Sequence, residues 1–310
     1  MNYIHTFNNN KSSFCSIIFS NKYVFLMQTI ILYFEQYTLG SKIILVCFFA
    51  VLLYMLLQFA LKLLEMGYVL RYKRPYYVHS YLFLRKLTPQ QKSVLKNQFR
   101  FYGKLSEKHK RYFEHRVASF IKDKDFIVRN GVVLTDEIKV LVSSTAVMLT
   151  FGFRDFYIGL INKIVIYPEK FFSRINNEYH KGEFNPKLKA LVISWSDFKM
   201  GYQIARDNIN LGIHEFVHAI HLNSLNERDI SSTIFSDSFK ELTELLSENE
   251  SIREELAESH YIRKYAFTNQ FEFLAVVIES FIETPQEFKS KFPEVYFKIR
   301  QMLNFNFAGY

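Results

Sequence analysis

An uncharged apolar run near the amino terminus constrains the fold more than any other feature of this sequence. The run, IILVCFFAVLLYMLLQFAL, covers residues 43–61 and has no Asp, Glu, Lys or Arg in its 19 positions. A helix of this length spans about 30 Å, the hydrocarbon thickness of a bilayer. A buried core helix is the alternative, but soluble domains seldom contain so long a run without charge. The sequence therefore predicts a transmembrane helix over residues 43–61.

The chain before this run, residues 1–42, contains a weaker apolar segment. Residues 23–34 provide only 12 positions, too few to cross a bilayer as a helix. Three interpretations remain open: the segment lies in the membrane interface, it forms a second weak span, or translation starts at Met27. The 43–61 run begins too late in the chain for a simple secretion signal.

Positive charge is concentrated directly after the apolar run. Residues 62–129 contain 17 Lys and Arg against 5 Asp and Glu, a net charge of +12 in a chain whose total is +9. Because Lys and Arg beside a span stay on the cytoplasmic side, we expect a single-pass protein whose large domain faces the cytoplasm. Residues 62–83 form a basic juxtamembrane connector that anionic headgroups of the bilayer would attract. No nucleic-acid-binding motif accompanies the charge, so no nucleic-acid partner is expected.

The rest of the chain, residues 84–310, predicts one α+β domain that is mainly helical with a small β-sheet. Thr88 and Thr135 are capping residues at helix starts. Further helices are expected at residues 204–222, 237–260 and 269–283 and after Pro285. Strands are expected at residues 126–134, 163–168 and 190–195. Both cysteines, Cys15 and Cys47, precede this domain, so the domain holds no disulfide and no cysteine metal cluster.

The strongest chemical motif is His214-Glu215-Phe216-Val217-His218, an H-E-x-x-H pattern. Residues four apart on a helix lie one above the other, so His214 and His218 can bind one Zn²⁺. Glu215 lies on a neighbouring face, where it can hold a water beside the metal without binding the ion. A surface helix with solvated histidines is the alternative. The apolar residues expected to face the core are Ile209, Ile213, Phe216, Val217 and Ile220.

A catalytic zinc site needs a third protein ligand and an open position for water. His221 lies about 10 Å along the helix from His214, too far to share the ion. We therefore expect His221 to orient a ligand or to gate the site. Glu272 and Glu279 are seven residues apart on a second amphipathic helix. One would bind zinc and the other would support a ligand histidine, and spacing alone leaves the assignment open.

Several ordered blocks within residues 84–304 resemble the zinc peptidases related to Mlc titration factor A. The matching blocks are LTDEIKVLVSSTAVML, FGFRDFYIGLINKIVIYP, LVISWSD, NLGIHEFVHAIH, YAFTNQFEFLAVVIESFIETP and FPEVY. The resemblance implies a zincin-like metallopeptidase domain that acts on peptides or proteins with Zn²⁺ as its cofactor. The best-known members are compact cytoplasmic proteins, so the amino-terminal apolar run lies outside the resemblance.

The resemblance also implies roles for single residues. Tyr265 matches a tyrosine near the metal that could donate its hydroxyl to the developing oxyanion. His221 occupies a position where the family usually has an aspartate, so the electrostatics around the ligands differ here. Glu279 is left to support a ligand histidine. The zinc ligands that the resemblance implies are His214, His218 and Glu272. The catalytic glutamate that it implies is Glu215.

Together these patterns predict a membrane-anchored metallopeptidase in which zinc activates a water and Glu215 acts as general base. Two interpretations remain open for the strand near residues 191–195: it offers backbone hydrogen bonds to an extended peptide, or it is an ordinary interior strand. The alternative is a membrane-tethered, zinc-containing binding module that sequesters a regulatory protein and has little or no peptidase activity. Family members are reported to bind the repressor Mlc, but no residue match carries that role to this chain.

Overall fold

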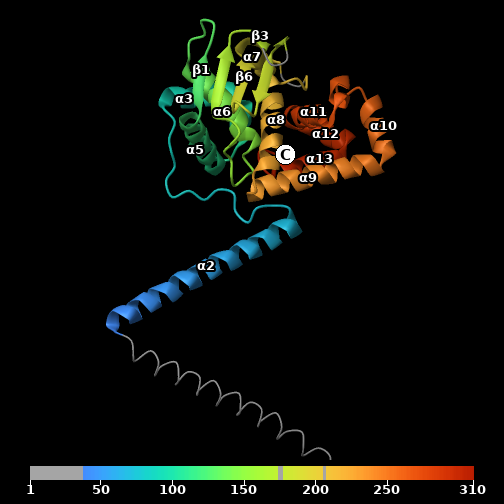
Figure 1. Ribbon diagram of the computed structural model, residues 1–310. Coiled ribbons are helices and arrows are strands. Elements are labelled where there is room, and N and C mark those ends of the chain that lie inside the picture. The colour runs from blue at the N-terminus through green and yellow to red at the C-terminus, as the bar shows by residue number, and fades with distance from the viewer. Residues whose placement is uncertain (1–37, 174–176, 205–206) are drawn as a thin grey trace, which may run out of the picture. The chain divides into compact units, whose positions relative to one another are not determined.

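The computed structural model describes residues 38–173, 177–204 and 207–310 (Figure 1). The apolar stretch at 23–34 and the alternative start at Met27 lie outside the described residues. The chain divides into two compact units, one that ends at Leu64 and one that spans Glu65–Tyr310.

Helix α2, Leu39–Tyr72, contains the apolar run and extends beyond it on both sides. By length and composition it is a candidate membrane span, and its most apolar window is not buried inside the protein. The connector predicted for residues 62–83 is therefore helical in its first part. The helix ends where Lys73 adopts a φ of 50°, shortly before Pro75, and both features stop a helix.

The end of α2 that belongs to the second unit packs against that unit. Val69 forms a small buried cluster with Ile230 and Ile234. Lys73 follows directly and makes ion pairs with Asp237 at 3.0 Å and Glu241 at 3.2 Å. Glu65 pairs with Arg154.

The second unit is mainly helical, as predicted, with short strands between residues 125 and 194. Its helices, including one 3₁₀ helix η1, are α3 (Pro89–Gln98), α4 (Arg100–Lys104), α5 (Glu107–Asp123), α6 (Asp136–Leu149), α7 (Trp195–Gln203), α8 (Leu211–Asn226), α9 (Ile230–Glu248), α10 (Glu250–Glu258), η1 (Lys264–Thr268), α11 (Gln270–Glu283), α12 (Pro285–Lys291) and α13 (Pro293–Met302). Its strands are β1 (Asp125–Val128), β2 (Lys163–Tyr167), β3 (Phe171–Ser173), β4 (Glu178–His180), β5 (Gly182–Asn185) and β6 (Ala190–Ser194).

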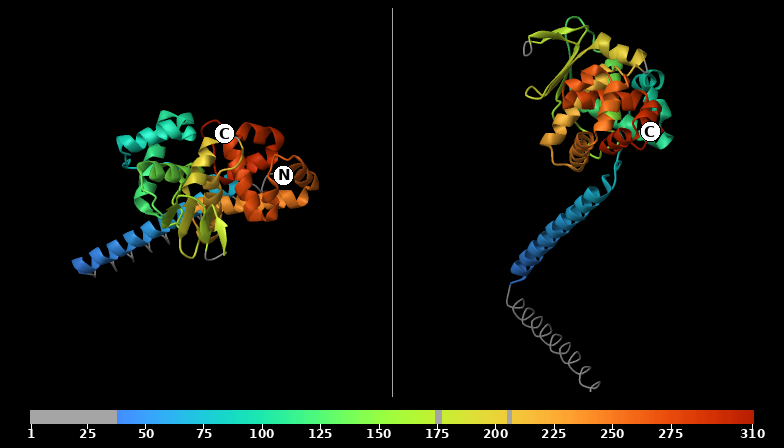
Figure 2. Two further views of the ribbon diagram at one scale, coloured as in Figure 1. Left: turned by 90° about the horizontal axis from the view of Figure 1, so that it is seen from above. Right: turned by 90° about the vertical axis from the view of Figure 1, so that its right-hand side faces the viewer.

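Four strands form one mixed sheet in the order β1-β2-β6-β5. Strands β1, β2 and β6 are parallel, whereas β5 runs antiparallel to β6 with Gly182 opposite Ile193. Because β6 is paired on both sides, the strand near residues 191–195 is an interior strand, and the alternative that it offers free backbone groups to a peptide is wrong. The sheet has two edge strands, β1 and β5, and β5 packs against α8. In both views of Figure 2 the yellow-green strands lie at one margin of the second unit, away from the red helices nearest the carboxyl terminus.

The predicted helix caps are present. Thr88 forms a capping box with Gln91, in which each side chain accepts a hydrogen bond from the other residue's backbone N–H at 3.2 Å. Thr135 accepts a hydrogen bond from Ile138 N at the start of α6. Such caps satisfy backbone donors that the first turn of a helix leaves free.

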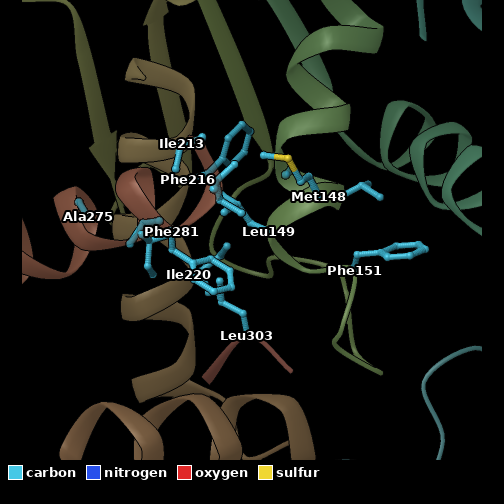
Figure 3. Close-up of a cluster of buried hydrophobic side chains, with 14 of the residues drawn as sticks. Met148, Leu149, Phe151, Ile213, Phe216, Ile220, Ala275, Phe281 and Leu303 are labelled. Carbon is cyan, nitrogen blue, oxygen red and sulfur yellow. The ribbon is translucent and has the colours of Figure 1, made fainter. Parts of the chain in front are cut away.

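The hydrophobic core surrounds α8, which lies between α6 and α11 (Figures 1 and 3). Phe216 and Ile220 of α8 meet Leu149 of α6 and Phe281 of α11, and all four are at most 4% exposed. Burying a side chain of this size stabilises the fold by about 1.5–3 kcal/mol. The core therefore fixes α8 on one side and leaves its opposite side for polar groups.

Candidate metal centre and active-site cleft

Helix α8 carries the H-E-x-x-H motif and begins at Leu211, later than the predicted residue 204. Asn208 has a φ of 57°, a left-handed conformation that interrupts a helix. Asn210 then caps α8, and its side chain accepts a hydrogen bond from Ile213 N at 3.1 Å. Ile209 consequently lies before the helix and is 50% exposed, so its predicted place in the core is wrong.

The other four residues of the predicted stripe are buried: Ile213, Phe216, Val217 and Ile220. The two histidines of the motif lie outside this packed face, and their side chains are 13% exposed for His214 and 18% exposed for His218. The division into a packing face and a polar face is thus confirmed for residues 211–222, the part of the predicted helix that is helical.

Helix α11 brings two carboxylates to the polar face of α8. Asn269 caps it, and its side chain accepts hydrogen bonds from the backbone N–H groups of Phe271 and Glu272 at 2.9 and 3.0 Å. Glu272 therefore lies in the first turn of α11. Glu279 lies almost two turns further along and is 1% exposed.

The side chains of His214, His218 and Glu272 converge. Their donor atoms all lie within 4.8 Å of one another. Glu272 Oε2 lies 2.9 Å from His214 Nε2 and 3.6 Å from His218 Nε2. Nitrogen and oxygen donors about 2.0–2.2 Å from a tetrahedral Zn²⁺ are separated by roughly 3.3–3.5 Å. The observed separations lie on either side of that value, so the three side chains fit a zinc ion.

Hydrogen bonding at Glu272 supports the same fit. Oε2 is buried, and among the described residues it has no hydrogen-bond partner of good geometry. A buried carboxylate oxygen without a donor is costly unless a cation compensates its charge. Two imidazoles and one carboxylate are also a donor set that Zn²⁺ prefers in catalytic sites.

Glu279 supports His214 rather than joining the ligand atoms. Its Oε1 lies 2.7 Å from His214 Nδ1 and accepts a hydrogen bond from Arg263 Nη2 at 2.7 Å. Its Oε2 accepts a hydrogen bond from Asn210 N, also at 2.7 Å. A carboxylate on the distal nitrogen of a ligand histidine fixes its tautomer and orientation. Glu272 therefore lies among the converging donor atoms, and Glu279 lies behind His214.

The charges of this cluster shift the pKa values of its members. Burial alone would lower the pKa of His214, but the carboxylates of Glu272 and Glu279 raise it to about 9. Burial would raise the pKa of Glu272, yet the imidazoles of His214 and His218 hold it well below its usual range. A metal binds histidine only in its neutral form, so a cation and a proton compete for this cluster.

Glu215 lies beside the ligands and under the edge strand. It is 7% exposed, and a Cβ atom built on Gly182 of β5 would lie only 2.6 Å from its Cγ and Oε1. Only a glycine allows the strand to come so close. Burial raises the pKa of Glu215, although the neighbouring His214 and His218 lower it. A raised pKa brings a carboxylate closer to the range useful for a general base.

A cleft of about 360 Å³ reaches part of this cluster, at His214, Glu215 and Glu279. It is lined by residues of β4, β5, α7, α8 and α11, by the segments before α8 and η1, and by η1 itself. The residues of the metal centre that line it are His214, Glu215, Arg263, Tyr265 and Glu279. A larger cavity of about 510 Å³ shares only Gly201 and Asn210 with the cleft and contains no ligand residue.

Comparison with known proteins agrees with this geometry. A family model described as glucose-regulated metallo-peptidase M90 matches residues 74–304, most of the chain. The chain belongs to this metallopeptidase family. It is also 26% identical over 242 residues to slr2042, an uncharacterized protein of Synechocystis sp., a match that covers 71% of this chain and 85% of the relative. The M90 family implies peptidase chemistry and a metal, usually zinc.

Tyr265 lies at the mouth of the cleft of this M90 protein. It is 52% exposed, and its ring centroid is 6.1 Å from that of His214. Partial burial and the charge of Glu272 raise the pKa of Tyr265 to about 12. Its hydroxyl therefore keeps its proton near neutral pH and can donate a hydrogen bond. Its role at an oxyanion stays a prediction.

His221 lies deeper than the ligands, in an aromatic cluster. It is 2% exposed, and its ring centroid lies 4.4 Å from that of Phe239 and 4.9 Å from that of Phe271. Burial, together with the charge of His218, lowers the pKa of His221 to about 4. No hydrogen bond in the described part of the chain joins its ring to a ligand, so its expected role in orienting a ligand or gating the site also stays a prediction.

Two residues of the site were not singled out from the sequence. Arg263 hydrogen-bonds Glu279 and lines the cleft, but an isolated arginine ahead of a helix carries no distinguishing pattern. Gly182 allows the edge strand to approach Glu215. A glycine at the start of a strand often marks such a close approach, and this signal was present in the sequence.

Proposed function

We propose that this M90 protein is a membrane-anchored, zinc-dependent metallopeptidase. The observation that carries the proposal is the convergence of the His214, His218 and Glu272 donor atoms beside the buried carboxylate of Glu215. When bound there, zinc would polarise a peptide carbonyl and lower the pKa of water toward neutrality. Proton transfer and stabilisation of the developing oxyanion are assigned to side chains of the cleft.

Glu215 is the proposed general base. Its carboxylate accepts a proton from the attacking water and passes it to the leaving amine. The Tyr265 hydroxyl donates a hydrogen bond to the oxygen on which negative charge develops. Glu279, held by Arg263 and Asn210, keeps the His214 ring oriented with Nε2 toward Glu272.

The edge strand β5 is the proposed binding place for the substrate backbone. Among the described strands of the four-stranded sheet it pairs only with β6, so its outer N–H and C=O groups are free to pair with an extended peptide. Gly182, its first residue, lies directly over Glu215. A peptide added along this edge would bring its backbone close to the general base.

Membrane anchoring by α2 is the other part of the proposal. Lys62, Arg71, Lys73 and Arg74 lie within the 20 residues after the apolar run, whereas the 20 residues before it contain only Lys42. This asymmetry supports a domain that faces the cytoplasm.

The test combines metal analysis with peptide cleavage on the full chain in detergent. We expect one zinc per chain and cleavage of a mixed peptide library that a chelator abolishes and added zinc restores. A chain that binds zinc but leaves every peptide intact, under conditions where a known metallopeptidase cleaves the same library, would overturn the enzymatic proposal.

A further inference from the structure

The connector between α2 and α3 displays two apolar side chains to solvent. Leu82 is 96% exposed and Phe83 is 88% exposed, the highest values for large apolar side chains among the described residues. Leaving such a side chain in water forgoes about 1.5–3 kcal/mol of burial energy. Two adjacent residues in this condition need an explanation.

The exposure does not come from a loosely attached connector, because residues on both sides of the pair are fixed to the domain. Arg116, which is fully buried, donates hydrogen bonds to the Tyr81 hydroxyl at 2.5 Å and to Val78 O at 3.2 Å. On the other side, Arg85 N donates a hydrogen bond to His115 Nδ1 at 2.7 Å. Leu82 and Phe83 therefore stand at the tip of a short loop whose two ends are both held by α5.

Two basic residues follow this tip in the sequence. Arg85 and Lys86 are exposed, and neither side chain forms an ion pair with another described residue. The connector from Lys73 to Leu87 contains no Asp or Glu. An apolar tip with adjacent basic side chains is suited to an anionic lipid surface, where the apolar groups enter the headgroup boundary and the cations meet phosphates.

Tyrosines at the end of α2 and just after it also suit a membrane–water interface. Tyr76 is 75% exposed, and its ring lies 5.6 Å from that of Tyr68. The Arg74 guanidinium lies 5.9 Å from the centroid of the Tyr68 ring and donates a hydrogen bond to its hydroxyl. Tyrosine and arginine together are typical of a membrane–water interface.

We propose that Leu82 and Phe83 insert into the interfacial layer of an anionic bilayer, with Arg85 and Lys86 at the phosphate groups. This loop is a second membrane contact, separate from α2. A bilayer is the fitting partner because the candidate span α2 ends only a short stretch earlier, at Tyr72, and because the tip carries positive charge alone. The inference rests on the membrane anchoring of the proposed function. Two contacts would restrict the rotation of the domain about its tether.

The experiment uses single tryptophans in the full chain. Trp195, the one natural tryptophan, is replaced by phenylalanine, and Phe83→Trp, Tyr54→Trp or Val133→Trp is added. Tyr54 lies in the apolar run of α2, and Val133, 75% exposed, is a solvent-facing apolar residue far from Leu82 and Phe83 in sequence. Each protein is reconstituted into vesicles of equal parts phosphatidylcholine and phosphatidylglycerol, with or without bromine on the acyl chains.

We expect brominated lipid to quench the tryptophans at positions 54 and 83 but not the one at position 133. Roughly half of the emission at position 83 should be lost, as for a side chain 5–10 Å into the boundary region. Arg85→Gln with Lys86→Gln should lower this quenching in anionic vesicles and leave position 54 unchanged. Leu82→Trp, checked by circular dichroism, repeats the measurement should Phe83→Trp fold poorly.

The outcomes distinguish membrane insertion of Leu82 and Phe83 from membrane anchoring by α2. Quenching at position 54 without quenching at positions 82 and 83 overturns the inference and keeps the anchored protein. No quenching at position 54 overturns the anchoring and the inference together. Emission at position 83 that shifts with protein density but not with bromine indicates self-association through the tip and also overturns the inference.

Discussion

Two clusters of buried polar groups lie inside this domain, and they differ in how fully their hydrogen bonds are satisfied. The first surrounds Arg116 of α5, whose side chain is fully buried without a carboxylate bonded to it. Every donor of its guanidinium has an acceptor. The acceptors are Tyr81 Oη and the backbone oxygens of Val78, Thr150, Phe151 and Phe153.

The second cluster is the candidate metal site, and its hydrogen bonds are not all satisfied. Glu272 Oε2 has no hydrogen-bond partner among the described residues, and Glu215 is buried with a raised pKa. Buried polar groups are normally all paired, and exceptions concentrate where chemistry occurs. The comparison therefore separates a polar cluster that serves the fold from one prepared for a ligand. Substitutions in each cluster should fail in different ways.

The largest effect is expected for Glu215→Gln. Removing the general base should lower kcat by about 10²–10⁴-fold, while zinc content stays at one per chain because the three ligands remain. Peptide cleavage and metal analysis of the same sample measure both. Glu254→Gln, on the exposed face of α10, is the matched control. Retained hydrolysis would remove Glu215 from the mechanism.

Arg116→Met should damage the fold instead of the chemistry. The substitution leaves several buried carbonyl groups without donors and should lower the free energy of unfolding by about 3–5 kcal/mol. Denaturant unfolding of the full chain in detergent gives the value. Arg111→Met, on the exposed side of the same helix, should change it little. If the two variants proved equally stable, the satisfied cluster would have no structural role.

Glu279→Gln tests a residue that shares features of both clusters. Both carboxylate oxygens of Glu279 have hydrogen-bond partners, as in the Arg116 cluster, and one of these partners is His214 of the candidate metal site. Weakening its hold on His214 should reduce zinc affinity by about 10–100-fold, measured by competition with a chromogenic chelator. Glu287→Gln on the neighbouring helix α12 provides the control. An unchanged zinc affinity would show that Asn210 and the core orient His214 without this carboxylate.

The smallest effect is expected for Glu283, which is linked to the candidate metal site by Asn210. Asn210 donates hydrogen bonds to both Glu279 and Glu283. Its Oε1 accepts a hydrogen bond from Asn210 Nδ2 at 3.2 Å, and its Oε2 accepts one from Asn208 N at 3.0 Å. Burial raises the pKa of Glu283 to about 7, although the bond from Asn210 lowers it. The folded state therefore binds this proton more tightly than the unfolded chain, whose glutamate pKa is about 4.3.

The sign of the pH effect follows. The contribution of Glu283 to stability is complete below about pH 4 and is lost as pH rises through 7. The free energy of unfolding of the wild type, minus that of Glu283→Gln, should fall by about 1–2 kcal/mol between pH 5 and pH 8, after allowance for partial exposure. Denaturation at the two pH values measures the difference. A pH-independent difference would mean that Glu283 titrates normally.

Much of the fold could be predicted from local sequence. Thr88, Thr135 and Asn269 mark helix starts that the structure contains, because capping depends on neighbouring residues alone. The start of α8 was placed too early, since the left-handed Asn208 interrupts an apolar pattern that otherwise continues. Strand β5 was missed, and the interior position of β6 was left open, because the order of strands in a sheet depends on contacts between distant segments.

The site shows the same division. The helical spacing of His214 and His218 and the position of Glu215 follow from one turn of α8. The separate places of Glu272 and Glu279 depend on how α11 crosses α8, which no spacing within one helix specifies. Arg263 and the Arg116 cluster were beyond local patterns, because their partners lie on other segments.

Gly182 has a consequence for how this cleft can vary. The Glu215 side chain fills the space that a side chain at position 182 would need. Alanine there would displace the acid while every ligand atom stayed in place, and the chain would hold its ion with the proton acceptor in the wrong position.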